Sequence, residues 1–314
     1  MAQTAGGTAL PRNVALPRSM DARYGRDIER GLVLGGGGVW FVAWQTGYLR
    51  RLEELGLQLG LADRLVGTSA GSIVASILAG EKLGGFARTV DLLTRAPGLL
   101  ARLASSGPLE PSCQRALDTF RDARDCEPET LRTIGYAALA ARTPTADTTA
   151  RNFSVILRMR RWPSSRLHIT CVDTYTGERC VITRSAAVPL ARATAASSAV
   201  PGIFSPQPIQ DRKCMDGGVA GTGVHLDLVA GARRALIISL VDGSEPELAW
   251  GTSTPASIRQ EFDDLIASGT EALRIVPRVE VPEDVMDPRL ALGAVHEGLA
   301  QADDDIAMLR EFWS

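Results

Sequence analysis

Hydrophobic and polar positions near the start of the chain follow two patterns in turn. A short apolar run within Gly31–Gly38 ends in four glycines, and apolar residues at helical spacing then follow over Val42–Gly56. The same plan returns at Arg64–Gly80, where a short apolar run turns sharply into a second helical pattern. Each stretch therefore predicts a strand, a tight turn and a helix.

The later part of the chain adds a hairpin, further strands and terminal helices. Two β-branched runs around a Thr-Gly turn predict the hairpin over Arg166–Thr183. Small residues predict a helix that stops at Pro201, and the apolar run in "RRALIISLVDG" predicts a buried strand. Helical patterns cover Glu261–Arg274 and Pro288–Ser314, with a strand in "RIVPRVEVP" between them. Strands that alternate with helices predict a largely parallel sheet covered by helices, the α/β class.

No convincing linker divides the sequence, so we expect a single domain over residues 28–314. Residues 1–27, rich in small residues, Pro and Arg, predict a flexible N-terminal arm. Residues 81–150 are mostly helical in pattern but broken by prolines, which makes them a candidate lid or helical insertion. No run has the roughly 18 apolar residues that a bilayer span needs, and no signal peptide is visible. We therefore expect a cytoplasmic protein whose contact with a membrane, if any, is peripheral.

Charge and cysteine content narrow the classes of function. A net charge of −2 argues against a dedicated nucleic-acid binder, which would normally be basic. The five cysteines are odd in number and contain no C-x-x-C pair, which fits a reducing compartment and gives no metal-site spacing. Cys171 and Cys180 are expected to face each other across the hairpin, as free thiols in preference to the alternative of a disulfide. No calcium-loop pattern is present, so neither a metal nor an organic cofactor is expected, and the oligomeric state is open.

The strongest chemical signal is a serine between two glycines. The pattern is Gly67-Thr68-Ser69-Ala70-Gly71, at the point where a predicted strand becomes a helix. A sharp bend there exposes the serine hydroxyl and brings strand and helix so close that only glycine fits on either side. The following helix points its positive dipole end at Ser69 and would favour a developing oxyanion. A tightly packed strand–helix junction without chemistry is the plainer alternative.

A glycine-rich loop precedes this motif. Consecutive glycines at Gly35, Gly36, Gly37 and Gly38 let backbone N–H groups turn towards one point and form an oxyanion hole. A dinucleotide-binding loop is the other interpretation, but Phe41 stands where that fingerprint needs its last glycine. A plain tight turn is the third.

Two residue types compete for the proton of the serine. Asp216, in "MDGGV", is followed by two glycines at the end of a predicted strand, which can hold its carboxylate rigidly. The alternative is His225, nine residues later, as the base of a Ser–His–Asp triad. His168 sits inside a predicted strand and His296 on a terminal helix, so neither is a strong candidate.

The three motifs in this order resemble the patatin-like phospholipase family. The resemblance rests on "LVLGGGG", "GTSAGS" and "MDGGV" and extends over roughly residues 31–243. It implies a three-layer α/β/α sandwich and hydrolysis of carboxylic esters in lipids or lipid-like substrates. In this family's manner Ser69 would attack the ester, Asp216 would take its proton as the second member of a dyad, and the N–H groups of the glycine loop would bind the oxyanion. An ordinary Asp, with a pKa of about 3.9, is a weak base for this task, and burial would raise that value.

The sequence departs from the family pattern directly after the glycines. Trp40 and Phe41 follow Val39, where the family usually has a basic or small polar residue and then a further glycine. We expect these two aromatic side chains either to line the substrate pocket or to belong to the core. Two other functions remain open: an acyltransferase or triad esterase that uses His225, and a binding protein whose altered loop no longer supports catalysis.

Overall fold

The computed structural model describes residues 14–95, 98, 109–244 and 251–314. In these residues the centre is an eight-stranded sheet with the order β5-β6-β3-β2-β1-β7-β8, and β4 pairs with β3. The strands are β1 (Arg30–Leu34), β2 (Arg64–Gly67), β3 (Leu167–Asp173), β4 (Arg179–Ile182), β5 (Gln207–Ile209), β6 (Arg212–Asp216), β7 (Arg234–Ile238) and β8 (Glu271–Ile275). From β3 through β2, β1 and β7 to β8 the pairing is parallel, whereas β4 and β6 pair antiparallel with β3. The sheet is therefore mixed, with a parallel half and an antiparallel extension.

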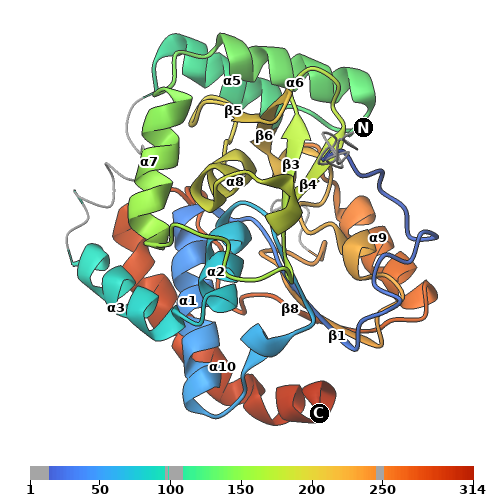
Figure 1. The fold of residues 1–314 in the computed structure, drawn as a ribbon. Helices are drawn as coiled ribbons and strands as arrows, with labels where there is room; N and C mark the ends of the chain where they lie inside the picture. The colour runs from blue at the N-terminus through green and yellow to red at the C-terminus, as the bar shows by residue number, and fades with distance from the viewer. Residues whose placement is uncertain (1–13, 96–97, 99–108, 245–250) are drawn as a thin grey trace, which may run out of the picture.

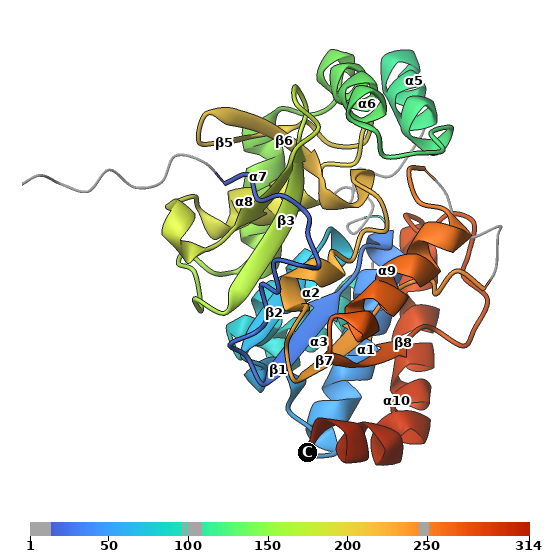
Figure 2. The same cartoon turned by 90° about the vertical axis from the view of Figure 1, so that its right-hand side faces the viewer.

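Helices cover both faces of this sheet. They are α1 (Gly38–Glu54), α2 (Ala70–Ala79), α3 (Leu83–Thr94), α5 (Pro111–Arg121), α6 (Pro128–Ala140), α7 (Ala146–Leu157), α8 (Leu190–Ser197), α9 (Pro255–Ala267) and α10 (Ala291–Trp313). Figures 1 and 2 show α5 and α6 together at the top of the molecule, above the ends of β3 and β6. Where residues 81–150 are described, they form α3, α5, α6 and α7, and their movement as a lid stays a prediction.

The alternation of side chains along β1 explains the three layers. Leu32 and Leu34 pack in the large core cluster with residues of α1, α2 and α10, while Val33 points to the opposite face and packs with Ile237 and Leu265 of α9. Successive side chains of a strand point to opposite faces, and a parallel strand covered on both faces reads as a continuous apolar run. The α/β class and the three-layer α/β/α sandwich are confirmed.

The chain before β1 differs from the expected flexible arm. Residues 14–27 lie against the molecule: Val14 is 8% exposed and its carbonyl accepts the N–H of Val181 at 2.9 Å. The N–H of Leu16 donates to the Arg179 carbonyl at 3.0 Å. One edge of β4 is not covered by another strand, so its backbone N–H and C=O groups need partners. The N-terminal segment supplies these partners. The expectation for residues 1–13 lies outside the described residues.

Two boundaries near the C-terminus also differ from the pattern-based prediction. Helix α9 begins at Pro255 instead of Glu261, because Thr254 and Ser257 form a capping box around a proline in the first turn. Strand β8 ends at Ile275, before Pro277, which has no N–H to continue the ladder.

Two further expectations concern cysteines and membranes. Cys171 and Cys180 are opposite each other on β3 and β4 and both are free, as predicted. Among the described helices, none is both long and apolar enough to cross a membrane.

Candidate active site

Ser69 sits in the turn between β2 and α2 with strained backbone angles. Its φ is 50° and its ψ is −119°, in a region that residues with side chains rarely adopt. Its N–H donates to the Ser197 hydroxyl at 2.9 Å, and its carbonyl accepts the Ser72 hydroxyl at 2.7 Å. Such strain persists only where the surroundings fix it, and it is typical of functional sites.

The two flanking glycines are required by close packing. A Cβ at Gly71 would lie 2.0 Å from the Leu34 carbonyl oxygen, and one at Gly67 would lie 2.7 Å from the Gly71 carbonyl oxygen. Real Cβ atoms do not approach backbone atoms so closely. The steric argument made from the sequence therefore holds at Gly67, which meets the following helix, whereas at Gly71 the close neighbour is the adjacent strand β1.

Asp216 is the last residue of β6, and the pairing of β6 with β3 determines its position. Gly67 of β2 pairs with Ile169 of β3, and two residues further on Cys171 of β3 pairs with Asp216. The strand register thus brings the end of β6 beside the serine turn, although the two residues are far apart in the chain. Both Ser69 and Asp216 line the same cavity.

The Asp216 carboxylate is buried and only half satisfied. Its Oδ1 accepts the Gly218 N–H at 2.7 Å, while its Oδ2 has no hydrogen-bond partner among the described residues. Burial raises the pKa of Asp216 to about 7, although the neighbouring Ser69 hydroxyl and the Gly218 N–H lower it. Ser69 Oγ lies beside the carboxylate without completing a hydrogen bond to it, as is common before substrate binds. The group can therefore take up a proton near neutral pH.

The glycine loop lies against the serine turn. A Cβ at Gly36 would be 3.2 Å from Ser69 Cβ and 3.9 Å from Ser69 Oγ. The Gly35 carbonyl accepts the Gly71 N–H at 3.0 Å and the Gln45 side-chain amide at 3.1 Å, which ties the loop to the turn. The Gly35 N–H donates to the Ile238 carbonyl at 2.9 Å, which corrects the expectation that Gly35 is a donor of the oxyanion hole. Within the described part of the chain, the N–H groups of Gly36 and Gly37 have no hydrogen-bond partner. Two free donors beside a serine hydroxyl can stabilise a developing negative charge.

The aromatic pair after the glycines belongs to the core. Trp40 and Phe41 are 3% and 0% exposed, and Phe41 stacks on Trp44 with 5.7 Å between ring centroids. The helix α1 begins at Gly38, so Val39 and Val42, three residues apart, face the cavity instead. The expectation that Trp40 and Phe41 line the substrate pocket is corrected, because the helical period turns them the other way.

His225 does not reach the cavity as a triad base would. Its side chain is fully buried, and Nε2 lies 3.0 Å from the Gly217 carbonyl. Burial, Arg18 and Arg179 together lower the pKa of His225 well below its ordinary value, so the ring is neutral. His225 is absent from the residues that line the cavity, and the geometry speaks against the triad alternative.

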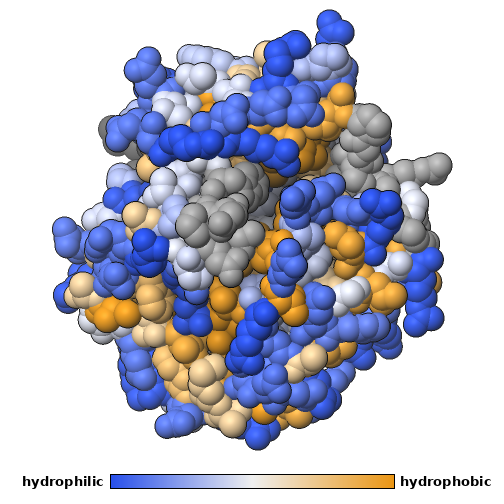
Figure 3. Space-filling model, turned by 180° about the vertical axis from the view of Figure 1, so that it is seen from behind, coloured by the Kyte–Doolittle hydropathy of each residue, from blue (hydrophilic) through white to orange (hydrophobic). Residues whose placement is uncertain are grey.

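The cavity is large and mostly apolar on one side. Its volume is about 1210 Å³, compared with roughly 300–1,000 Å³ for pockets that hold drug-sized ligands. Side chains of α3, α5 and α7 form the apolar wall: Phe86, Val90, Leu93, Leu117, Phe120, Phe153 and Ile156. The exposed acidic residues Glu280, Glu283 and Asp284 line another part. In Figure 3 hydrophobic residues gather in a hollow below the topmost helices.

The chain matches a family model and is similar to solved structures. Residues 32–227 match the family model described as patatin-like phospholipase. VipD from Legionella pneumophila aligns at 14% identity with a TM-score of 0.41, covering 94% of this chain and 68% of the VipD chain. The type III effector protein ExoU aligns at 19% identity with a TM-score of 0.31, covering 88% of this chain and 53% of its own. The search of curated proteins gave no match.

The family match extends over more than half of the chain. It contains the glycine loop, the serine turn and the Asp-Gly-Gly turn, the same three motifs that carry the resemblance in the sequence. This protein belongs to the patatin-like phospholipase family.

Proposed function

We propose that this protein hydrolyses carboxylic esters of lipids through Ser69 and Asp216. Membership of the family supports lipid acyl hydrolase activity. The observation that carries the residue assignment is the strained Ser69, with φ 50°, in one cavity with a buried carboxylate whose Oδ2 has no partner. The apolar wall suits an acyl chain, and peripheral membrane contact remains a prediction.

The reaction proceeds in two balanced steps. Ser69 Oγ attacks the ester carbonyl while Asp216 accepts the hydroxyl proton, and the N–H groups of Gly36 and Gly37 hold the oxyanion. The tetrahedral intermediate collapses, the alcohol leaves with the proton from Asp216, and an acyl-serine ester remains. Water then attacks this ester, Asp216 takes the proton of the water, and the acid leaves as Ser69 regains its hydrogen.

Labelling and turnover test the assignment together. A fluorophosphonate probe should label the wild type, and p-nitrophenyl esters of increasing chain length should be hydrolysed beside phospholipid vesicles. Ser69→Ala should abolish labelling and lower turnover by at least about 10³-fold, since the nucleophile is lost. Ser76→Ala is the matched control, because Ser76 is buried in α2, the helix that follows Ser69, and is absent from the residues that line the cavity.

Three outcomes would contradict the proposal. Labelling that persists in Ser69→Ala would place the nucleophile elsewhere. Full turnover by Asp216→Asn would remove the carboxylate from the chemistry. Absence of labelling and turnover in folded wild type would favour the silent binding protein.

A further inference from the structure

The turn that carries Asp216 is held from outside by side chains distant in the sequence. Asp216 caps the short helix Gly217–Val219, so the position of this turn sets where the carboxylate points. The carbonyl of Val219 accepts the Thr252 hydroxyl at 2.7 Å, and the carbonyl of Ala220 accepts the Arg18 guanidinium at 2.8 Å. The carbonyl of Gly217, directly after Asp216, is held by His225.

His225 occupies an energetically costly position for this contact. Its backbone is left-handed, with φ 54° and ψ 58°, and its Nδ1 is buried without a partner among the described residues. The left-handed backbone and the unpartnered buried nitrogen each disfavour a histidine at this position. Among the described residues, the one hydrogen bond of the His225 side chain joins Nε2 to the Gly217 carbonyl at 3.0 Å, and this contact offsets part of that cost.

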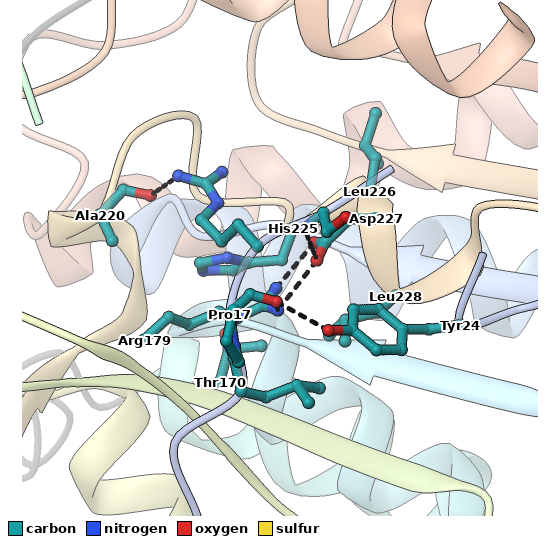
Figure 4. A network of polar contacts seen from close by, with 12 residues as sticks. Pro17, Tyr24, Thr170, Arg179, Ala220, His225, Leu226, Asp227 and Leu228 are labelled. Atoms are coloured by element: carbon teal, nitrogen blue, oxygen red, sulfur yellow. Dashed lines mark hydrogen bonds and ion pairs between the residues drawn. The ribbon is translucent and has the colours of Figure 1, made fainter. Parts of the chain in front are cut away.

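The surroundings fix the ring in one protonation state. A carbonyl only accepts, so the proton of the neutral ring lies on Nε2. The charged groups around the ring are Arg18, Arg179, Asp227 and Glu261: Arg179 pairs with Asp227, and Arg18 with Glu261. Figure 4 shows the His225 ring beside the Arg179–Asp227 pair, with Ala220 to one side.

We propose that His225 is a positioning residue for Asp216: its Nε2–H holds the Gly217 carbonyl and, through it, the turn that aims the carboxylate at Ser69. The inference rests on the proposed function of the Ser69–Asp216 pair. His225 itself neither touches the substrate nor moves a proton. Its loss should therefore lower kcat and leave KM nearly unchanged.

Two amide substitutions separate the hydrogen bond from the backbone strain. In His225→Gln the amide nitrogen can occupy nearly the place of Nε2 and donate to Gly217. In His225→Asn the shorter side chain cannot reach, although Asn tolerates the left-handed backbone better. If the hydrogen bond matters, His225→Gln should keep kcat within about threefold, and His225→Asn should lose roughly tenfold to a hundredfold, the cost of a misplaced catalytic group.

The measurements are kcat and KM on a p-nitrophenyl ester and the rate of fluorophosphonate labelling of Ser69, in the full chain. Better activity of His225→Asn than of His225→Gln would overturn the inference, as would equal activity of both variants or a loss carried by KM. An inactive, unlabelled wild type would overturn the proposed function and this inference with it. An active wild type with indifferent variants would overturn this inference alone.

A second measurement does not depend on the variants folding. Nitrogen NMR of the wild-type imidazole should find the Nε2–H tautomer, unchanged between about pH 5 and 8. A proton on Nδ1 with none on Nε2 would contradict the assigned contact and overturn the inference.

Discussion

At the residue scale, the environment of Asp216 sets the chemistry. Its sequence context predicts only an Asp-Gly turn, whereas the fold removes water from the carboxylate and raises its pKa to about 7. A base works best when its pKa lies near the working pH, so burial supplies what the residue type lacks. In the proposed mechanism, activity requires the deprotonated form.

The raised pKa predicts opposite effects of pH on activity and stability. We expect kcat/KM to fall as pH drops below about 7, because Asp216 becomes protonated. Between about pH 4 and pH 7 the native state binds more protons here than the unfolded chain, so the free energy of unfolding should fall as pH rises.

Asp216→Asn should remove both effects. The variant should be inactive yet more stable than wild type at about pH 8, by up to about 4 kcal/mol, and nearly equal to it at about pH 4. Urea unfolding at both pH values measures the difference. A variant that is less stable at the higher pH would contradict the assigned burial cost.

His225 and Trp40 show why single residues are hard to assign from a sequence. His225 stands out by its distance from Asp216, but only the fold reveals that its ring contacts the turn after Asp216 and does not reach the cavity. Trp40 lies only two residues after the glycine loop, yet the helical period of α1 turns Val39 and Val42 towards the cavity instead. Direction of a side chain depends on where its helix begins.

At the element scale, the β2–α2 turn depends on the absence of side chains. Gly71→Ala would place a Cβ 2.0 Å from the Leu34 carbonyl oxygen, so backbone must move. We expect a loss of at least about 1–3 kcal/mol in unfolding free energy and a loss of Ser69 labelling.

Gly85→Ala is the matched control for this substitution. Gly85 lies in α3, and a Cβ there meets nothing within 4 Å. Alanine should stabilise this helix by roughly 0.5–1 kcal/mol and leave labelling unchanged. Thermal unfolding of both variants tests the pair, and equal effects at the two positions would argue against the steric role of Gly71.

At the scale of the whole molecule, one buried ion pair ties distant segments together. Arg179 of β4 pairs with Asp227 at 2.7 Å, with side-chain exposures of 2% and 4%. Asp227 also accepts the Ser19 N–H, and Arg179 donates to the carbonyls of Leu16 and Pro17. The pair therefore joins the hairpin, the loop after Asp216 and the N-terminal segment.

Removing one partner of this pair should be costly. Asp227→Asn leaves Arg179 buried without its counter-charge, and we expect a loss of roughly 3–5 kcal/mol in urea unfolding. Glu29→Gln breaks the exposed pair with Arg233, whose side chains are 69% and 60% exposed, and should cost at most about 1 kcal/mol. Losses of similar size at both sites would contradict the stabilising role of the buried Arg179–Asp227 pair.

Much of this protein's structure can be predicted from local patterns in its sequence. The strand–glycine–helix plan, the α/β class and the three motifs follow from hydrophobic period and from where only glycine fits. The bounds predicted for helix α9 and strand β8 differ from those in the structure. A capping box and a proline determine where these elements begin and end, and they outweigh hydrophobic periodicity there. The sequence of residues 14–27 gives no local signal of ordered structure. The segment becomes ordered by pairing with the open edge of β4.

The sequence by itself determined which residue types could do the chemistry: a serine between glycines, a carboxylate before glycines and a loop of consecutive glycines. Only the tertiary structure determined that these groups lie together, because the register of β6 on β3 places Asp216 beside the serine turn. The tertiary structure also determined the pKa of Asp216 and the directions in which the side chains of Trp40, His225 and the valines of α1 point. Burial and register are properties of contacts between distant segments, and a local pattern does not encode them.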